Sequence, residues 1–436
     1  MKYYCIGIKG SGMATLAEIL YDLGNSVSGY DDYKPYKFTQ EGIDKRGIKI
    51  YYDSTHEIDK DTIVTYSKAF SQDHPEIKRV HDLGLKVIEY NELLGKLSSE
   101  FKTIGVSGTH GKTTTSTMIS HVLKNTNGCN YFIGDGSGFA DKNNELFTLE
   151  SCEFNRHFLS YNPYYAIVTN IELEHTECYK DINEIIDTFS KFANKANVVI
   201  ACGDDLNVRK MNVNNKVIYY GLNDNNDVVA KNIKLTKNGS EFDVYKDGNL
   251  YGHFDIPLFG EHMILNALAC IIVCDLEGVK KEDIHDLLET FKNAKRRFKE
   301  EVYGDVVIID DYAHHPTEIR VTIESARQKY PNKEIIAVFL PNTYSRTEAL
   351  MDDFISALKT ADKAYVMDIH CDRESKEDYP GVSSDEIIKN IENAEKLSIE
   401  TVDKLLKHNN AAICFMSCTN IYEIEDKFKE LLKNKK

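Results

Sequence analysis

Long apolar runs, excess basic charge and the CxxC repeats of a metal site are all missing from this 436-residue chain. No apolar run reaches the roughly 18 residues of a transmembrane helix. The 53 Lys and Arg residues are outnumbered by 69 Asp and Glu, which gives a net charge of −16 at pH 7. This balance argues against nonspecific nucleic-acid binding and against a polybasic membrane anchor. It still permits anionic ligands, because backbone N–H groups and a lysine can bind phosphate inside an acidic protein.

Ten cysteines are scattered along the chain without the CxxC repeats that are typical of a zinc site. Two CxxxC pairs, Cys270/Cys274 and Cys414/Cys418, lie within apolar segments. We therefore expect buried, reduced thiols and a cytoplasmic protein. Residues 1–7 are soon followed by further glycines and are typical of a strand rather than of a signal peptide.

The length and the hydrophobic pattern together predict three domains. At roughly 150 residues per domain, 436 residues correspond to about three. Short apolar runs alternate with helical patterns before residue 98 and after residue 298, which is typical of parallel α/β sheets. Residues 217–254 favour β structure, with a hairpin signal at Asp247-Gly248. We predict α/β domains at residues 1–98, 99–297 and 298–436.

The same pattern predicts individual elements. We expect strands at residues 3–8, 26–29, 62–65, 86–89, 103–108, 166–169, 198–201, 242–245, 250–254, 306–309, 335–340, 364–367 and 413–416. We expect helices at residues 13–23, 74–83, 112–123 and 264–275.

A glycine-rich segment joins the strand at 103–108 to the helix at 112–123, which is the context of a phosphate-binding loop. Backbone N–H groups freed by glycine, together with the helix N-terminus, would face phosphate oxygens. Lys112 would neutralise charge on the transferred phosphoryl group, and the Thr113 hydroxyl would ligate magnesium. The match is imperfect, because Val106 occupies the first glycine position. A plain glycine turn with a surface lysine is the alternative.

A second glycine turn, at residues 7–12, joins the first strand to the first helix, and Asp31 follows the next strand. It resembles a dinucleotide-binding fingerprint, but its spacing is G-x-x-G-x-G rather than G-x-G-x-x-G. The functional interpretation is a diphosphate bound at the helix N-terminus. Simple packing between strand and helix is the alternative.

Eight short blocks occur in the order found in the Mur ligase family. They are GIKGSGM (7–13), GTHGKTTT (108–115), CEFNRHF (152–158), TNIELEH (169–175), NALA (266–269), KRRF (295–298), DDYAHHPTE (310–318) and YSRT (344–347). The chain most resembles the members that join L-alanine to UDP-N-acetylmuramate, in the form found in low-GC Gram-positive bacteria. The resemblance implies an N-terminal Rossmann-like domain for the UDP-sugar, a central ATP-binding domain, and a C-terminal Rossmann-like domain that closes on ATP and the amino acid.

The resemblance also implies a nucleotide site and a metal site in the central domain. Glu153 and His175 align with the family's magnesium ligands, beside Thr113. Outside such a block, a histidine after a strand is more often a packing residue, and magnesium prefers oxygen ligands. Asn266 would contact adenine, Asp311 the ribose and Arg297 the phosphates. The full set of implied ATP contacts is Gly108, Thr109, His110, Gly111, Lys112, Thr113, Thr114, Asn266, Arg297 and Asp311.

The implied substrate contacts lie in the first and third domains. The set is Gly10, Ser11, Gly12, Met13, Asp31, Tyr312, His315 and Arg373. His314 and Arg346 would orient the alanine and its carboxylate. The implied catalytic set is Lys112, Glu153, His175, His314 and Arg346.

The implied reaction activates a carboxylate with ATP and magnesium, in peptidoglycan precursor synthesis. The lactyl carboxylate of UDP-N-acetylmuramate attacks the γ-phosphate and gives an acyl phosphate and ADP. The amine of L-alanine then attacks and releases phosphate. Neither nucleic acid nor a membrane takes part, and the family includes monomers and homodimers.

Four positions depart from the family's pattern. Glu174 stands where the family has Asp, Asn342 where it often has His, and Asn293 where it usually has Gly. Residues 417–420, Ser-Cys-Thr-Asn, replace a glycine-rich loop. Asn342 and residues 417–420 lie in the predicted third domain, whereas the ATPase motifs are intact, so ATP use is better determined than the acceptor amino acid.

Three alternatives remain open at this stage. The chain is a related Mur-type ligase with another acceptor or donor, a nucleotide- or UDP-sugar-binding regulator without turnover, or a Rossmann dehydrogenase. Only residues 7–12 favour the last, and the phosphate-binding loop argues against it.

Overall fold

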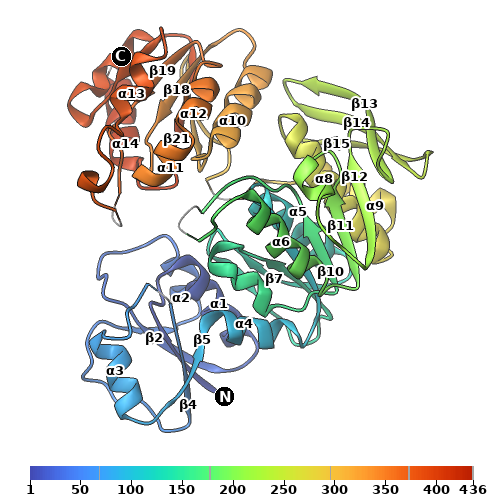
Figure 1. Cartoon of the computed structure of the whole chain (residues 1–436), viewed down its shortest axis with the longest axis vertical. Coiled ribbons are helices and arrows are strands. Elements are labelled where there is room, and N and C mark those ends of the chain that lie inside the picture. The colour runs from blue at the N-terminus through green and yellow to red at the C-terminus, as the bar shows by residue number, and fades with distance from the viewer. Residues whose placement is uncertain (68, 176–177, 295, 372–373, 435–436) are drawn as a thin grey trace.

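Three β-sheets, each with its own helices, divide the chain into three parts (Figure 1). The computed structural model describes residues 1–67, 69–175, 178–294, 296–371 and 374–434. In Figure 1 the N-terminal part is blue, the central part runs from cyan to yellow, and the C-terminal part is orange to red. This arrangement confirms the predicted three-domain α/β architecture. Among the described helices, none is both long enough and apolar enough to span a bilayer.

The N-terminal sheet is parallel, with the order β3-β2-β1-β4-β5. Its strands are β1 (Lys2–Ile6), β2 (Ser26–Tyr30), β3 (Lys49–Tyr51), β4 (Thr62–Tyr66) and β5 (Lys86–Glu89). The helices are α1 (Ser11–Asp22), α2 (Gln40–Lys45), α3 (Pro75–Asp82) and α4 (Tyr90–Ser98). The chain reverses its direction across the sheet between β1 and β4, and such a switch point is where open α/β sheets bind ligands.

The central sheet has ten strands in the order β15-β14-β13-β12-β11-β10-β6-β9-β7-β8. They are β6 (Lys102–Ser107), β7 (Cys129–Ile133), β8 (Ser137–Phe139), β9 (Leu146–Glu150), β10 (Tyr165–Val168), β11 (Val198–Cys202), β12 (Lys216–Gly221), β13 (Val228–Thr236), β14 (Gly239–Lys246) and β15 (Asn249–Ile256). The helices are α5 (Lys112–Asn125), α6 (Ile182–Ala193), α7 (Leu206–Arg209), α8 (Glu261–Leu276) and α9 (Lys281–Glu289), with a 3₁₀ segment η1 (Phe154–Ser160).

The C-terminal sheet has the order β16-β17-β21-β18-β19-β20, and only the edge strand β16 is antiparallel to its neighbour. Its strands are β16 (Lys299–Tyr303), β17 (Val306–Asp311), β18 (Glu334–Phe339), β19 (Lys363–Val366), β20 (Ala394–Lys396) and β21 (Ala411–Met416). Its helices are α10 (Pro316–Lys329), α11 (Tyr344–Ala349), α12 (Met351–Leu358), α13 (Ser384–Lys389) and α14 (Tyr422–Asn434), with 3₁₀ segments η2 (Lys376–Asp378) and η3 (Ile399–Lys407).

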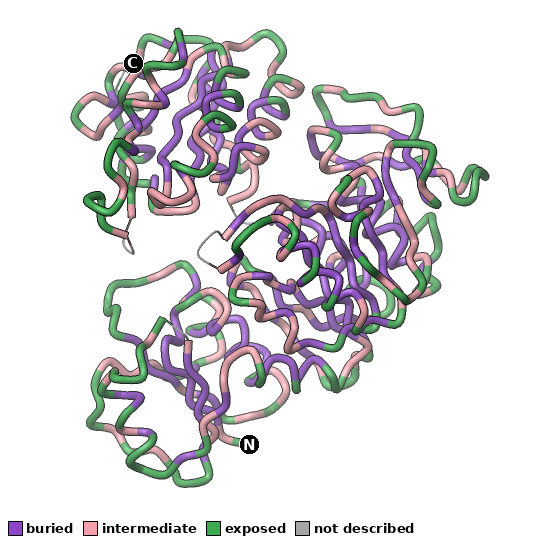
Figure 2. Tube along the Cα trace, viewed as in Figure 1, coloured by how far each residue is buried: buried purple, intermediate pink, exposed green. Residues whose placement is uncertain are grey.

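Buried residues follow the strands and the sheet-facing sides of the helices in all three parts (Figure 2). Each predicted strand and helix overlaps an observed one, and the hairpin at Asp247-Gly248 joins β14 to β15. Besides the short strands β3, β16 and β20, the pattern missed β7, β8 and β9, which place an extra edge beside β6. These strands are short, and the turn at residues 134–136 (Gly-Asp-Gly) and polar residues 141–145 interrupt them. Their alternation of apolar and polar residues is therefore too short to predict a strand.

The N-terminal and central parts share one hydrophobic core, because α1 packs on β8. A Cβ on Gly138 would lie 2.7 Å from the carbonyl oxygen of Thr15, so the two backbones approach closely. Arg46 ties α2 to this junction through Asp22 and Glu18. Met13, a predicted substrate contact, lies in this core with 3 % of its surface exposed. The structure therefore gives its side chain a packing role.

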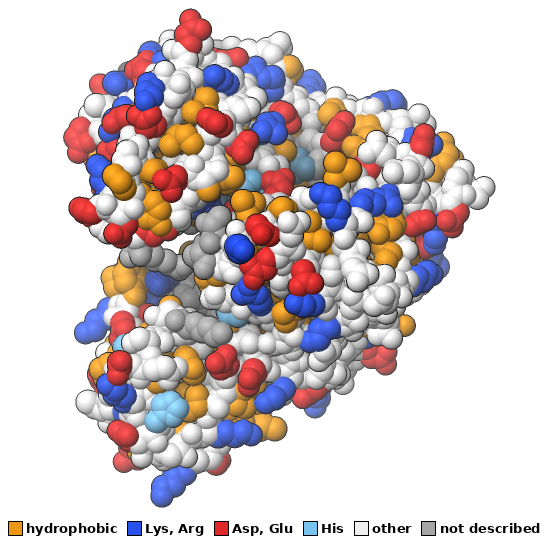
Figure 3. Space-filling model, viewed as in Figure 1, with side chains coloured by type: hydrophobic (Ala, Val, Ile, Leu, Met, Phe, Trp, Pro, Cys, Tyr) orange, Lys and Arg blue, Asp and Glu red, His pale blue; other side chains and the backbone are white. Residues whose placement is uncertain are grey.

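The described cysteines are all free thiols. Cys270 and Cys274 lie one helical turn apart on α8, with 3.9 Å between their sulfurs. Figure 3 shows charged side chains of both signs interspersed over the visible face.

Candidate active site

The phosphate-binding loop lies between β6 and α5, at the carboxyl edge of the central sheet. Gly111 precedes α5 with a φ of +80°, a left-handed conformation that glycine adopts without strain. A Cβ on Gly111 would lie 2.7 Å from Asn266 Oδ1, so Asn266 of α8 lies directly against the loop. A Cβ on Gly108 would lie 1.9 Å from Thr169 Oγ1. Glycine is therefore required at both positions.

Lys112 folds back over this loop. Its Nζ donates to the carbonyl oxygens of Gly108 at 2.6 Å and Thr109 at 3.0 Å. The same Nζ lies 3.1 Å from Oε1 and 3.0 Å from Oε2 of Glu153. Burial lowers the pKa of Lys112, but the carboxylates of Glu153 and Glu150 outweigh burial and leave the pKa raised. The loop therefore holds a charged ammonium group, as transfer of a phosphoryl group requires.

Oxygen-bearing side chains surround the start of α5. Glu153 Oε2 is buried and lacks a hydrogen-bond partner among the described residues, although it lies within ion-pair distance of Lys112. His175 Nε2 is 3.7 Å from Glu153 Oε1. His175 has a φ of +55°, which is uncommon for a residue with a side chain. Thr113, Glu153 and His175, the predicted magnesium ligands, thus lie near one another.

Glu150 is a site residue that sequence reasoning left without a role. Its Oε1 accepts from Thr113 Oγ1 at 2.9 Å, and its Oε2 accepts from the Gly134 amide at 2.7 Å. Burial raises the pKa of this carboxyl group. Its place at the end of β9, three residues before Glu153, is the signal that could have identified it, because strand ends in α/β sheets face ligands.

A cavity of about 440 Å³ opens over the loop and gathers residues from all three parts of the chain. Predicted site residues that line it are Ser11, Thr109, His110, Gly111, Lys112, Thr113, Glu153, His175, Arg297, Tyr312 and His314. Other lining residues are Phe38, Gly134, Asp135, Glu150, Cys152, Glu174, Arg296, Glu318 and Cys418. Residues more than 300 positions apart in the sequence therefore share one cavity.

A second cavity of about 450 Å³ lies beside the first, between the central and C-terminal parts. Arg297 and Asp311 line it together with the aromatic rings of Phe259, Phe291 and Phe298. Such rings present flat apolar faces to a base. Both oxygens of Asp311 accept backbone N–H groups, from Phe298 at 2.8 Å and Ala313 at 2.9 Å. Burial raises the pKa of Asp311 to about 6.

His262 and Asn293 also line this second cavity, and Asn293 is one of the four departures. Burial, followed by the charge of Arg297, lowers the pKa of His262 to about 4. Asn293 Oδ1 accepts from Thr114 Oγ1 at 3.3 Å, which links it to the first turn of α5.

His110 connects the loop to the C-terminal part. Its Nε2 is 3.3 Å from Glu172 and its Nδ1 is 3.3 Å from Glu318 of α10. His315 Nδ1 lies 3.4 Å from the same Glu172 carboxylate, and the two histidine rings are 4.5 Å apart. Burial alone would lower the pKa of His110, but the two glutamate carboxylates outweigh burial and raise the pKa to about 9. Burial and the neighbouring charge of His110 lower the pKa of His315 to about 4.

His314 lies in the loop just before α10. Its Nδ1 is 3.1 Å from Glu318 Oε2, and that oxygen also accepts the backbone amides of His314 and His315. Tyr312 stacks edge-on to the His314 ring, with centroids 5.4 Å apart. Glu318, unassigned by the sequence, therefore organises the loop before α10.

Arg346 lies on α11 and reaches Glu174 of the central part, at 2.6 Å and 2.9 Å. A further cavity of about 200 Å³ lies beside this pair and includes Ser345 and Glu374. Asn342 is turned to the backbone, since its Nδ2 donates to the carbonyl oxygen of His370 at 3.2 Å.

The other positions singled out from the sequence are residues 417–420, Gly10, Gly12 and Arg373. Residues 417–420 follow β21, where the carbonyl oxygens of Ser417 and Thr419 accept from Arg296 at 3.0 and 3.2 Å. Gly10 is the N-cap of α1, and Gly12 lies under the Tyr90 hydroxyl. Arg373, a predicted substrate contact, lies outside the described residues.

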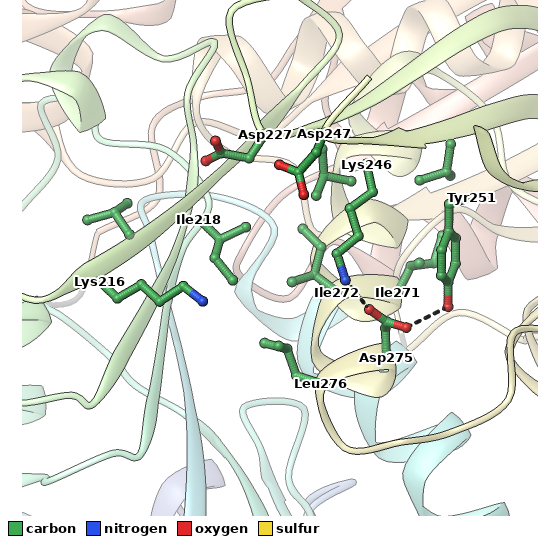
Figure 4. Close-up of a pocket in the computed structure, with 13 residues that line it drawn as sticks. Lys216, Ile218, Asp227, Lys246, Asp247, Tyr251, Ile271, Ile272, Asp275 and Leu276 are labelled. Carbon is green, nitrogen blue, oxygen red and sulfur yellow. Dashed lines mark hydrogen bonds and ion pairs between the residues drawn. The ribbon is translucent and has the colours of Figure 1, made fainter. Parts of the chain in front are cut away.

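Another cavity, of about 220 Å³, lies away from this site, between β12–β15 and α8 (Figure 4). Its floor includes Ile218, Ile271 and Ile272. At its rim Lys246 pairs with Asp275 at 2.6 Å, and Tyr251 donates to the same carboxylate at 3.0 Å. Lys246, Tyr251 and Asp275 therefore pair with one another at this cavity.

Three models of Mur ligase domains match consecutive segments of the chain. The Mur ligase family catalytic domain matches residues 2–102, the Mur ligase middle domain residues 106–274, and the Mur ligase glutamate ligase domain residues 296–414. Together these segments span most of the chain, in the family's order.

Solved structures share the fold over its full length. UDP-N-acetylmuramate-alanine ligase MurC from Thermotoga maritima is 24 % identical, with 100 % of both chains covered and a TM-score of 0.82. A murein peptide ligase from Psychrobacter arcticus is 21 % identical, with 100 % and 99 % covered and a TM-score of 0.69. MurF ligase from Thermotoga maritima, solved in complex with ADP, is 16 % identical, with 95 % and 97 % covered and a TM-score of 0.66. At these identities the likeness concerns the fold.

Proposed function

Because this chain belongs to the Mur ligase family and is an ATP-dependent ligase of peptidoglycan synthesis, we propose that it joins L-alanine to the lactyl carboxylate of UDP-N-acetylmuramate. One observation carries the proposal: a single cavity brings Lys112 together with Ser11 of the N-terminal turn and His314 of the C-terminal part. A reaction that couples ATP, a sugar nucleotide and an amino acid needs one site to which all three parts of the chain contribute residues.

The reaction proceeds in two steps. The lactyl carboxylate attacks the γ-phosphate, forming an acyl phosphate as the bond to ADP breaks. The amine of L-alanine attacks the acyl carbon, and phosphate leaves from the tetrahedral intermediate. Neither step needs a protein nucleophile, so the chain contributes positioning and charge neutralisation.

Lys112 is the residue that neutralises charge on the phosphoryl group while it is transferred. Its hydrogen bonds to Gly108 and Thr109 hold the ammonium over the loop before ATP arrives. Such preorganisation avoids reorienting the charge during the reaction. His110 and Arg297 add positive charge beside the same cavity.

The oxygen donors at the start of α5 fit magnesium. Glu153 has a buried oxygen without a hydrogen-bond partner among the residues described, and Thr113 and Glu150 supply two more oxygens. Magnesium prefers such ligands and retains water as well. When bound, it would neutralise charge on the β- and γ-phosphates. His175, at 3.7 Å from Glu153, completes the proposed set.

On the amino-acid side, His314, Tyr312 and Arg346 are the proposed contacts. His314 and Tyr312 line the main cavity, and Arg346 lies beside the smaller one next to it. Closing of the C-terminal part over the bound substrates would exclude water, which otherwise hydrolyses the acyl phosphate.

Phosphate release measured with ATP, magnesium and UDP-N-acetylmuramate tests the proposal. We expect release only when an amino acid is present, with L-alanine preferred over glycine and L-serine. Release that is stimulated by another amino acid or by a peptide would keep the assignment as a ligase but change the proposed acceptor. No stimulated release from a protein that binds nucleotide would favour a regulator.

A ligase with another acceptor is the second candidate. Asn342 faces the backbone of His370 instead of the cavity, and residues 417–420 lack the glycines of the family's loop. Both features lie on the amino-acid side. A tripeptide included in the same assay separates this candidate from the first.

A further inference from the structure

Lys9 is almost entirely buried, with 1 % of its surface exposed, although it lies in a glycine turn at the edge of the N-terminal sheet. A buried ammonium group is costly unless hydrogen bonds replace its water. Its Nζ donates to the carbonyl oxygens of Tyr33 at 2.8 Å and Pro35 at 2.7 Å, with Lys34 at 3.4 Å. The rings of Tyr33 and Tyr52 lie 5.5 and 5.3 Å from it, which adds cation–π attraction.

The backbone of Lys9 holds both ends of the same loop, residues 31–39. Its N–H donates to Asp31 Oδ2 at 2.9 Å, and its carbonyl oxygen accepts from Thr39 Oγ1 at 2.7 Å. The loop itself contains neither helix nor strand. Its shape therefore depends on Lys9 at its start, its middle and its end.

This loop presents side chains suited to a nucleotide. Tyr33, Tyr36 and Phe38 are 48 %, 63 % and 51 % exposed, which is unusual for three aromatic residues in one short loop. Lys34 is exposed and Lys37 partly so. Aromatic faces stack on a base, and lysines bind phosphate oxygens.

The loop also lies beside an anion-binding position. Phe38 lines the main cavity together with Ser11, the first residue of α1. The first turn of α1 contains no acidic residue, and its N-terminus faces the switch point between β1 and β4. A helix N-terminus at such a point attracts a diphosphate.

We infer that Lys9 is a positioning residue that holds loop 31–39 in the shape that receives the uridine diphosphate part of the sugar nucleotide. This inference rests on the proposed function. Lys9 does not contact the reacting atoms, so its loss changes the affinity for the sugar nucleotide and leaves the chemical step unaltered.

Lys9→Met tests the inference, because methionine fills the space without the charge. We expect the Kd of UDP, measured by calorimetry, and the KM of UDP-N-acetylmuramate to rise about tenfold or more. The KM of ATP and kcat stay within about twofold of the parent value, since those interactions lie in other domains. Lys2→Met is the matched control, because Lys2 lies on the adjoining strand but pairs at the surface with Asp59 and Asp61.

A double variant of exposed loop residues, Lys34→Ala with Tyr36→Ala, keeps the inference testable if Lys9→Met does not fold. It too should weaken UDP binding with kcat unchanged. Unchanged UDP affinity in this double variant overturns the inference. So does a folded Lys9→Met variant with parental affinity, or one in which kcat and melting temperature fall while KM stays constant.

The UDP measurement does not require turnover, so the two claims can fail separately. A parent protein that binds UDP but releases no phosphate with any amino acid contradicts the proposed ligase and leaves the loop assignment standing. A parent protein that does not bind UDP overturns both.

Discussion

Arg346 donates two hydrogen bonds, of 2.9 and 2.6 Å, to one oxygen of Glu174, a residue 172 positions earlier in the chain and in another domain. The two side chains are 14 % and 8 % exposed. The charge of Arg346 helps to hold the pKa of Glu174 well below its usual range, against the opposing effect of burial. Glu174 is also the position at which the chain departs from the family's aspartate. Compared with aspartate, Glu174 has one more methylene group, and its longer side chain makes an interdomain contact.

Removal of Arg346 should weaken the contact between the central and C-terminal parts. Arg346→Ala removes the arginine partner of the buried Glu174, and breaking such a pair costs about 3 kcal/mol or more. We expect a lower melting temperature by calorimetry and a larger radius of gyration by small-angle scattering. Arg327→Ala is the control, because Arg327 pairs with Asp362 at 3.1 Å where both side chains are above 40 % exposed. Equal effects of the two substitutions would contradict a special role for Arg346.

Lys112→Ala should abolish ADP formation and leave UDP-sugar binding nearly unchanged. The substitution removes the ammonium group from the phosphate-binding loop and its ion pair with Glu153. The glycine turn at residues 7–12, where we propose that the sugar nucleotide binds, follows β1 of a separate sheet. ADP formation by coupled assay and UDP binding by calorimetry measure the two effects. Loss of UDP binding with ATPase activity intact would reverse the domain assignment.

Gly111→Ala should weaken ATP binding by more than backbone strain alone explains. A left-handed φ costs a residue with a side chain roughly 1 kcal/mol. At Gly111 the new Cβ also meets Asn266 Oδ1 at 2.7 Å. Gly278→Ala is the matched control, since Gly278 has a φ of +74° with nothing within 4 Å of its Cβ position. Nucleotide affinity should fall in the first variant and remain unchanged in the second.

The interdomain contact made by His110 should weaken as pH rises. The pKa of His110 is raised from 6.5 to about 9 between Glu172 and Glu318, so the folded state retains a proton that the unfolded chain loses. Its stabilising contribution is complete below about pH 6.5 and disappears as pH rises to about 9. Melting temperatures at pH 6, 7.5 and 9 check this, with His110→Gln expected to give a flatter dependence. Parallel curves for the two proteins would exclude His110 as the titrating group.

The sequence alone determined the three-domain α/β plan and the phosphate-binding loop. Strand and helix periods are local, and the loop needs only glycines, a lysine and a following helix in consecutive positions. Gly108, Gly111 and Lys112 therefore lie where a local pattern puts them, and the structure agrees.

Contacts that join distant segments were decided by the tertiary structure. No local signal pairs Arg346 with Glu174, places Glu318 against His110, or fastens loop 31–39 to Lys9, because each pairing depends on how whole sheets are set against one another. Met13 shows the same principle in reverse. Its motif position predicts a ligand contact, which stays a prediction, while tertiary packing buries its side chain in the core that the N-terminal and central parts share.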